Sequence, residues 1–260
     1  MTERNCREIL DSEDGLDRLF FELASQNRLA ILHELQKERL RMQQIAKRLN
    51  VTPTEAFRQL ERLGAASLVQ RSSDGAFALT EYGKQVLQIS ASLAFISEHK
   101  EYFLNHELTG LPPQFVGRAG ELSGARLEPD TIRTLNMGTD AFTRAKQYIW
   151  GIGEGVVPEH MVPVMDKQVQ TGIEVKMVVS GRRFHLSEKA LPVPKNVETR
   201  VMDDCPVMIA LTEKYAVVSF RQVGGVADYA AFVGDDRTFH GWARDVFLYY
   251  WERGKRFSAR

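Results

Sequence analysis

Apolar residues recur at helical spacing in two short segments near residue 50. Met42, Ile45 and Leu49 are separated by three and then four residues, which places them on one face of a helix. The pattern breaks at Asn50-Val51 and restarts at Thr52. The chain therefore predicts two helices joined by a tight turn.

The second of these helices begins at residues that favour a helix start. Thr52 suits the N-cap, Pro53 suits the first turn, and Glu55 occupies the acidic position of a capping box. We expect the helix to end at Gly64.

The same helix has one apolar stripe, and the remaining side chains point away from it. Ala56, Leu60 and Leu63 form the stripe. At about 100° per residue, the other residues face outward or flank the core side. The outward and flanking residues are Thr54, Phe57, Arg58, Glu61 and Arg62.

Two strand patterns follow, at residues 68–71 and 76–79. Ser72-Ser73-Asp74-Gly75 separates them, and its Asp-Gly pair is typical of a tight hairpin turn. A helix pair followed by a hairpin is the order of elements in a winged helix-turn-helix.

These residues resemble a known family. RQLERLGAASLV, the hairpin, LTEYGKQVL from Leu79 and the earlier QNRLAILHEL look like archaeal and bacterial winged helix-turn-helix regulators of the ArsR/MarR type. In that family the second helix of the motif enters the major groove and the hairpin follows phosphates or the neighbouring minor groove. The resemblance implies DNA binding by Gln43, Lys47, Thr54, Phe57, Arg58, Arg62, Arg71, Ser72 and Ser73. The family often has a small polar residue at the position of Phe57, so stacking on DNA and packing on the hairpin both stay open for that ring.

Helical spacing continues on both sides of the motif. Residues 15–25 and 27–36 predict two scaffold helices, and residues 81–105 predict one long helix. The apolar stripe of the long helix is narrow, as in helices that pair with another helix. We favour a homodimer through this stripe, with an intramolecular brace as the alternative. The stripe consists of Tyr82, Val86, Ile89, Leu93, Ile96 and Phe103, and Lys100 interrupts it.

The pattern changes after LTGLPP at residues 108–113, where consecutive prolines end the incoming helix. We therefore expect a winged-helix domain at residues 1–80, a connecting helix at 81–107 and an effector domain at 108–260. The predicted fold class is α+β, with a C-terminal α/β sandwich around a mixed sheet. Its expected helices cover 113–122, 130–147, 159–170 and 237–256, and its strands 147–152, 173–180, 197–202, 207–211, 215–220 and 230–233.

The second domain also resembles a known family. LPPQFVGRAGELSGA, AKQYIWGIGEGVVPEHMVPVMDKQVQTGIEVKMVVS and FHGWARDVFLYYWERGKRF are similar to the effector domain of archaeal methanogenesis regulatory proteins, whose architecture resembles half of a phospholipase D-like unit. The phospholipase D reaction needs a histidine nucleophile and a lysine two residues later. The corresponding hairpin, PVMIALTEKYAVVSF from Pro206, has no histidine. The resemblance therefore implies the fold without that catalysis.

Composition adds limits to the possible functions. The 260 residues are 43% hydrophobic and 26% charged, as in ordinary globular proteins, and the zero net charge argues against an indiscriminate nucleic-acid coat. Residues 26–80 nevertheless carry nine Lys or Arg against five Asp or Glu. No apolar run approaches the roughly 18 residues of a membrane span, and the polar start lacks a signal-peptide core. We expect a soluble, cytoplasmic protein with no membrane partner.

Candidate metal, cofactor and catalytic residues do not cluster. Cys6 and Cys205 are far apart, which suits reduced thiols, with redox sensing by Cys205 as a minor alternative. The six histidines lack metal-ligand spacing, and GIGEG at residues 151–155 lacks the Lys-Ser/Thr pair of a nucleotide loop. Asp203-Asp204 and Asp235-Asp236 are interpreted as turn residues. We expect no metal, no cofactor and no catalytic residue.

A small-molecule site is expected at the carboxyl ends of the strands, where open α/β sheets bind ligands. Its candidate residues are Trp150, Glu154, Arg182, Arg183 and His185. The sequence thus predicts a DNA-binding transcriptional regulator that pairs with itself and responds to an effector. The alternatives are a divergent phospholipase D-like phosphodiesterase with a winged-helix appendage and a winged-helix protein-interaction module.

Overall fold

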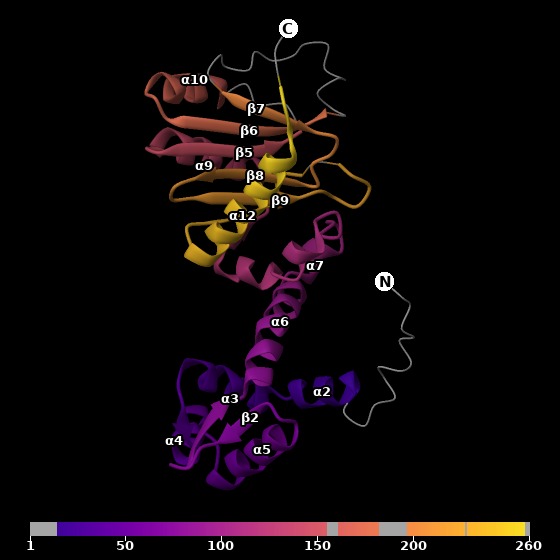
Figure 1. The fold of residues 1–260 in the computed structure, drawn as a ribbon, viewed down its shortest axis with the longest axis vertical. Coiled ribbons are helices and arrows are strands. Elements are labelled where there is room, and N and C mark those ends of the chain that lie inside the picture. The colour runs from indigo at the N-terminus through magenta and orange to yellow at the C-terminus, as the bar shows by residue number, and fades with distance from the viewer. Residues whose placement is uncertain (1–14, 155–160, 182–196, 227, 258–260) are drawn as a thin grey trace. The chain divides into compact units, whose positions relative to one another are not determined.

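The computed structural model describes residues 15–154, 161–181, 197–226 and 228–257. The chain divides into two compact units, one up to residue 90 and one from residue 91 (Figure 1). Helices and a mixed sheet occur together, so the predicted α+β class is confirmed.

The N-terminal unit combines helices with a small antiparallel sheet of order β1-β3-β2. Its core gathers the apolar faces of the helices around fully buried Leu32, Ile45 and Leu60. The two-residue strand β1 was not predicted, because so short a segment has no periodicity. The elements are α2 (Leu16–Leu23), α3 (Gln26–Lys37), β1 (Leu40–Arg41), α4 (Met42–Leu49), α5 (Pro53–Ala65), β2 (Val69–Arg71), β3 (Ala76–Leu79) and the first part of α6 (Glu81–Glu98).

The turn between α4 and α5 has specific stop and start residues. Asn50 is left-handed, with φ 53°, and the N–H of Val51 donates to the carbonyl of Ala46 at 3.0 Å. The Thr52 hydroxyl then accepts the N–H of Glu55 at 3.2 Å, as predicted for the N-cap.

The predicted end of α5 at Gly64 is wrong. The helix continues to Ala65, and the left-handed residue that follows is Ser67, with φ 58°. The N–H of Leu68 donates to the carbonyl of Leu63 at 2.9 Å, and both leucines are fully buried. The contact between Leu63 and Leu68 places the left-handed residue at Ser67. Gly64 therefore stays within the helix.

The hairpin after α5 has the predicted strands and turn. Val69 pairs with Leu79 and Arg71 with Phe77. Gly75 has φ 81°, a conformation that favours glycine, and the N–H of Ser72 donates to the carbonyl of Ala76 at 2.7 Å. The register of the hairpin is therefore fixed by its turn.

The prediction of one helix over residues 81–105 is wrong in its second half. α6 ends at Glu98, and α7 (Lys100–Phe103) follows a break at His99, where φ is −100° and ψ is 32°. Rings on both sides of the break contact Phe232: the ring centroids of Phe95 and Tyr102 each lie 5.0 Å from it. The break follows from this tertiary cluster.

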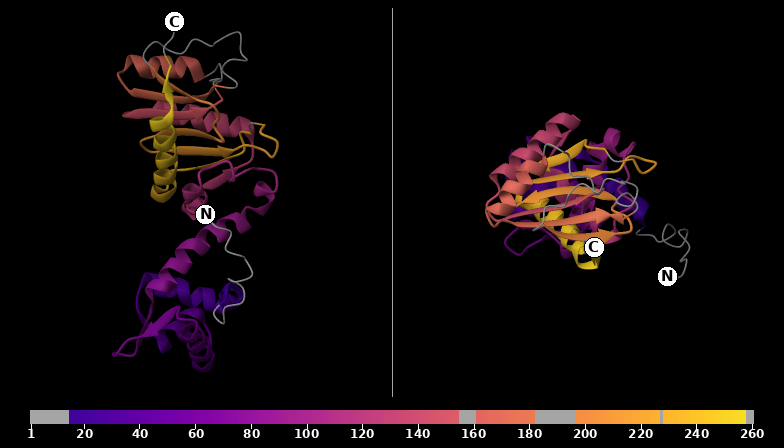
Figure 2. Two further views of the ribbon diagram at one scale, coloured as in Figure 1. Left: turned by 45° about the vertical axis from the view of Figure 1, so that its right-hand side comes forward. Right: turned by 90° about the horizontal axis from the view of Figure 1, so that it is seen from above.

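In its described residues the C-terminal unit has an eight-stranded sheet of order β11-β7-β6-β5-β8-β9-β10-β4, in which β5, β6 and β7 pair in parallel and the other neighbours are antiparallel. The mixed sheet is as predicted. α12 packs on one face, and α9 and α10 lie on the other (Figure 2). The strands are β4 (Arg126–Glu128), β5 (Tyr148–Gly153), β6 (Glu174–Ser180), β7 (Glu198–Met202), β8 (Val207–Thr212), β9 (Ala216–Phe220), β10 (Ala231–Gly234) and β11 (Lys255–Arg256); the helices are α8 (Pro113–Val116), η1 (Ala119–Gly124), α9 (Thr131–Arg144), α10 (Val162–Gln170) and α12 (Arg237–Arg253).

Two expectations for this unit need correction. The predicted helix at 113–122 is two short helices, α8 and η1, because Gly117 and Gly120 bind the Ser92 hydroxyl of α6 through their backbone. The edge strands β4 and β11 were not predicted, since they have three and two residues. Within the described segments, no helix combines the length and apolarity of a membrane span.

Candidate nucleic-acid interface

The outward side of α5 carries the side chains that the sequence assigned to it. Thr54 is exposed, Phe57 is 51% exposed, and the Arg58 side chain is 70% exposed. The opposite side of the helix is buried in the core of the unit. Thr54, Phe57 and Arg58 therefore form an exposed polar and aromatic ridge on a helix whose opposite side packs in the core.

The charge of Arg58 has a half-buried partner, Glu55. Its Nη2 donates to Glu55 Oε2 at 2.6 Å, three residues earlier on the same helix. Exposed ion pairs of this kind contribute about 0–1 kcal/mol. Glu55 does not complete the capping box that its position suggested, because its carboxylate accepts hydrogen bonds from Arg58 and Gln59. The Arg58 guanidinium can exchange this partner for a phosphate at small cost.

Arg62 lies differently from Arg58. Its guanidinium donates to both carboxylate oxygens of Glu22 in α2, from Nη2 at 2.7 Å and from Nε at 3.2 Å. The Arg62 side chain is 39% exposed, whereas that of Glu22 is 9% exposed. The hydrogen bonds that Arg62 donates to Glu22 raise the pKa of Arg62. The structure thus brings Arg62 to α2 instead of projecting it beside Arg58.

The hairpin places two predicted residues on its outer side. Arg71 and Ser73 are exposed, and Ser72 is half-buried. At the tip, Arg39 pairs with Asp74 at 3.0 Å. The backbone N–H of Ala76, and then Arg39, lower the pKa of Asp74. Arg39 was not predicted, because its contact with the hairpin joins residues 35 positions apart and has no local signal.

On α4, Gln43 and Lys47 are both exposed. The neighbouring Arg48 is held by two carboxylates of the scaffold, Glu34 at 2.9 Å and Glu38 at 2.7 Å. The ion pairs of Arg48 thus connect α4 to the end of α3, whereas Lys47 is exposed to solvent.

In the C-terminal unit, Trp150 is a core residue. It is 8% exposed, its indole N–H donates to Glu174 Oε1 at 2.7 Å, and its ring stacks on Phe247 of α12 at 4.8 Å. A side chain held in this way does not line a ligand crevice. Arg182, Arg183 and His185 lie outside the described residues.

Glu154 lies at the carboxyl end of β5 with charged neighbours that the sequence did not reveal. Its Oε1 is 3.7 Å from Nε of Arg221, and Nη2 of Arg221 is 2.7 Å from Oδ1 of Asp204. Asp204, interpreted from sequence as a turn residue, therefore also belongs to an ion-pair cluster. Burial raises the pKa of the adjacent Cys205 thiol to about 12, which keeps it protonated at neutral pH.

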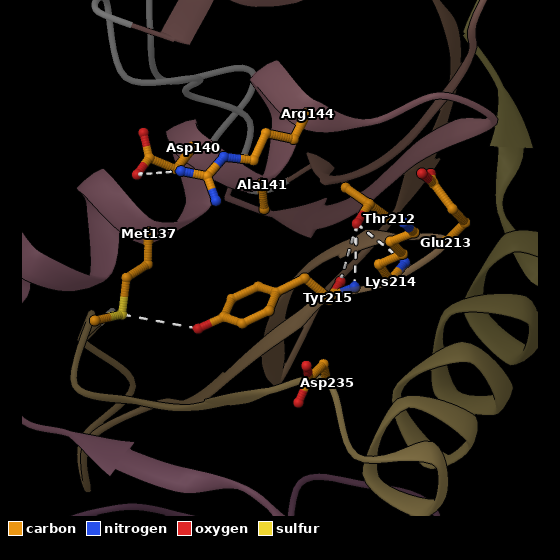
Figure 3. Close-up of a pocket in the computed structure, with 9 residues that line it drawn as sticks. All are labelled: Met137, Asp140, Ala141, Arg144, Thr212, Glu213, Lys214, Tyr215 and Asp235. Carbon is orange, nitrogen blue, oxygen red and sulfur yellow. Dashed lines mark hydrogen bonds and ion pairs between the residues drawn. The ribbon is translucent and has the colours of Figure 1, made fainter.

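A cavity of about 320 Å³ lies at the other end of the sheet, between α9 and the β8–β9 turn (Figure 3). Tyr215 reaches across it toward Met137, and its hydroxyl lies 3.8 Å from the Met137 sulfur. Arg144 and Asp140 stand along α9, with Ala141 between them (Figure 3). The cavity was not predicted, because its lining depends on strand register. Thr212, Glu213, Lys214 and Asp235 complete its lining.

Part of the C-terminal unit matches a known family. Residues 139–253 match the family described as methanogenesis regulatory protein FilR1, middle domain. The match covers somewhat less than half of the chain. The predicted likeness to methanogenesis regulatory proteins is therefore confirmed over these residues. No curated protein matches the chain.

Solved structures with a similar arrangement are distant. TrmBL2, described as an archaeal chromatin protein with a novel mode of DNA binding, is 11% identical with a TM-score of 0.41, over 84% of this chain and 88% of that one. NucT from Helicobacter pylori is 12% identical with a TM-score of 0.42, over 51% and 96%. Nuc from Salmonella typhimurium, a phospholipase D family member, is 13% identical with a TM-score of 0.38, over 48% and 90%. Likenesses at this level do not assign an activity or a partner.

Proposed function

We propose that this chain is a DNA-binding transcriptional regulator whose N-terminal unit reads duplex DNA as a winged helix-turn-helix. The observation that carries the proposal is the exposed ridge of Thr54, Phe57 and Arg58 on a helix whose other side is buried. Such a helix fits the major groove, and the hairpin with Arg71 and Ser73 suits the adjacent backbone. The match of residues 139–253 to a regulatory protein supports the same assignment.

Fluorescence anisotropy with a labelled duplex from upstream of the chain's own gene tests the proposal. We expect tighter binding to this duplex than to one of shuffled sequence, and an affinity that falls steeply with salt. Equal and weak binding to both duplexes would refute sequence-specific recognition. Catalysis of the phospholipase D kind is not proposed, since residues 206–220 contain no histidine.

The proposed regulator acts as a homodimer through α6. Ile89 is 65% exposed, and Tyr82 and Leu93 are also exposed, at spacings of seven and four residues along one side of the helix. A stripe with this spacing suits the matching stripe of a second copy. A dimer would present two copies of α5 to successive major grooves.

Replacing Ile89 with lysine is expected to convert the dimer to a monomer, because a charge would then enter the centre of the stripe. Light scattering after size-exclusion chromatography measures the mass directly. Gln88→Lys adds the same charge at a neighbouring exposed position and is expected to stay dimeric. A monomeric wild-type protein, or an Ile89→Lys variant with dimer mass, would contradict this interface.

We further propose that the C-terminal unit binds a small-molecule effector in the cavity beside α9, and that binding modulates the affinity for DNA. A volume of about 320 Å³ is at the lower end for ligand sites. Met137, Ala141 and Tyr215 provide apolar surface, and the charged residues at its edge are of both signs: Arg144 and Lys214 against Asp140, Glu213 and Asp235. This combination suits a small aromatic molecule with polar substituents and no net negative charge.

Ala141→Phe is expected to abolish effector binding, because the larger ring would fill the cavity. The measurement is the rise in melting temperature when a panel of small neutral and cationic aromatic compounds is added, which is expected for the wild type and absent in the variant. Thr143→Phe changes an exposed position nearby on α9 and should keep the response. An unchanged response in Ala141→Phe would place binding elsewhere.

A further inference from the structure

A buried carboxylate connects α2 to α5 behind the exposed ridge. Glu22 is 7% exposed, although it lies on a short surface helix. Its side chain pairs with two arginines: Arg28 of α3, with Nε 3.0 Å from Oε2, and Arg62 of α5, which takes both oxygens. Buried charges normally require such partners, so this carboxylate has a structural reason to be retained.

Arg28 extends the connection in two directions. Its Nε and Nη2 donate to the carbonyls of Glu22 and Phe21, each at 2.7 Å, which satisfies acceptors at the end of α2 that have no partner within the helix. Its Nη1 donates to Oε1 of Gln59 in α5 at 3.1 Å. Burial lowers the pKa of Arg28, and Glu22 counteracts this effect. One buried guanidinium thus joins α2, α3 and α5.

The same chain of hydrogen bonds reaches the ridge. Gln59 donates from its amide nitrogen to Glu55, and Glu55 accepts from Arg58. Arg62 gains a further contact, since its guanidinium carbon lies 5.0 Å from the centroid of the Phe21 ring. All these bonds fix the rotation of α5 about its own axis, and that rotation decides which side chains face the DNA.

We propose that Glu22 and Arg62 are positioning residues for the DNA interface: Glu22 clamps α5 through Arg62 and Arg28, and Arg62 contributes to DNA affinity through this clamp and not by contacting a phosphate. The inference rests on the proposed DNA-binding function and reassigns one of the residues predicted from sequence. The geometry favours it because Arg62 already directs two of its donors at a carboxylate that is itself buried.

The salt dependence of DNA affinity separates positioning from phosphate contact. Each neutralised phosphate contributes about 0.9 to the slope of log affinity against log salt. Arg62→Gln and Glu22→Gln are each expected to weaken binding about tenfold with an unchanged slope, and the double variant should resemble either single one, because the two residues act as one unit. Arg58→Gln is the positive control, and it should lower the slope by about 0.9 per bound copy.

Arg62→Lys keeps the charge but loses the two-point contact, and it disturbs folding less than removal of Glu22. The positioning role predicts that Arg62→Lys weakens binding almost as much as Arg62→Gln, whereas a phosphate contact would be largely retained. Melting temperatures identify any variant that fails to fold. A lower slope in Arg62→Gln, or undiminished or tighter binding by Glu22→Gln, would overturn the inference. An unchanged slope in Arg58→Gln would instead refute the DNA-binding face itself.

Discussion

Alanine at position 83 is expected to destabilise the N-terminal unit by about 2 kcal/mol or more, as overpacking of a close contact does. A Cβ at Gly83 would lie 2.1 Å from the carbonyl oxygen of Leu68, which is backbone and has little freedom to move. The site is further constrained by Thr80, whose hydroxyl accepts the N–H of Gly83 at 2.9 Å and donates to the carbonyl of Ser67 at 2.6 Å. The glycine therefore permits α6 to begin directly against the loop that precedes β2.

Gly64→Ala is the matched control for this experiment, because Gly64 also lies in a helix but has open space around its Cα. We expect it to stabilise the unit by about 0.4–1 kcal/mol, since alanine has less conformational freedom than glycine in the unfolded chain. Urea unfolding followed by circular dichroism gives both values, and hydrogen exchange of amides before residue 91 assigns them to this unit. Similar stability of the two variants would contradict the close contact.

Arg58→Glu is expected to weaken specific DNA binding about 100-fold or more. Loss of one arginine contact costs about 1–3 kcal/mol, a dimer loses two, and the new carboxylates add repulsion from the phosphates. Arg58 suits this test because its side chain is 70% exposed and pairs with Glu55 three residues earlier on the same helix, so the core side of α5 is left intact. Anisotropy titrations against the upstream duplex measure the change.

Arg133→Glu provides the control for net charge, since Arg133 is exposed on α9 of the C-terminal unit. It is expected to change the affinity only slightly. Equal losses in the two variants would mean that DNA responds to overall charge, and undiminished binding by Arg58→Glu would remove α5 from the interface.

Much of the N-terminal unit could be predicted because its signals are local. The N-cap at Thr52, the interruption at Asn50 and the turn at Gly75 each depend on residues within four positions. The exposed ridge followed from helical periodicity alone. The prediction of a helix end at Gly64 was wrong because this end is set by a non-local contact. The helix ends where Leu68 is buried in the core, and this burial requires the left-handed conformation of Ser67.

The features that could not be predicted depend on contacts between residues far apart in the sequence. Arg62 was assigned to DNA because its position flanks the ridge, yet its partner Glu22 lies 40 residues earlier in the chain. The break at His99 follows from the packing of Phe95 and Tyr102 on Phe232. Trp150 was assigned to a ligand site expected at the carboxyl ends of the strands, but the alternation of side chains along β5 turns it toward α12.

Photo-crosslinking from position 57 tests the central claim most directly, since the claim is that the side of α5 carrying Phe57 lies against duplex DNA. Benzoylphenylalanine would replace Phe57 in one protein and Ile132, exposed on α9 of the C-terminal unit, in a control. With the upstream duplex bound, we predict a protein–DNA adduct from position 57 and none from position 132. Bound DNA that forms no adduct with position 57, or forms one equally with position 132, would contradict the claim.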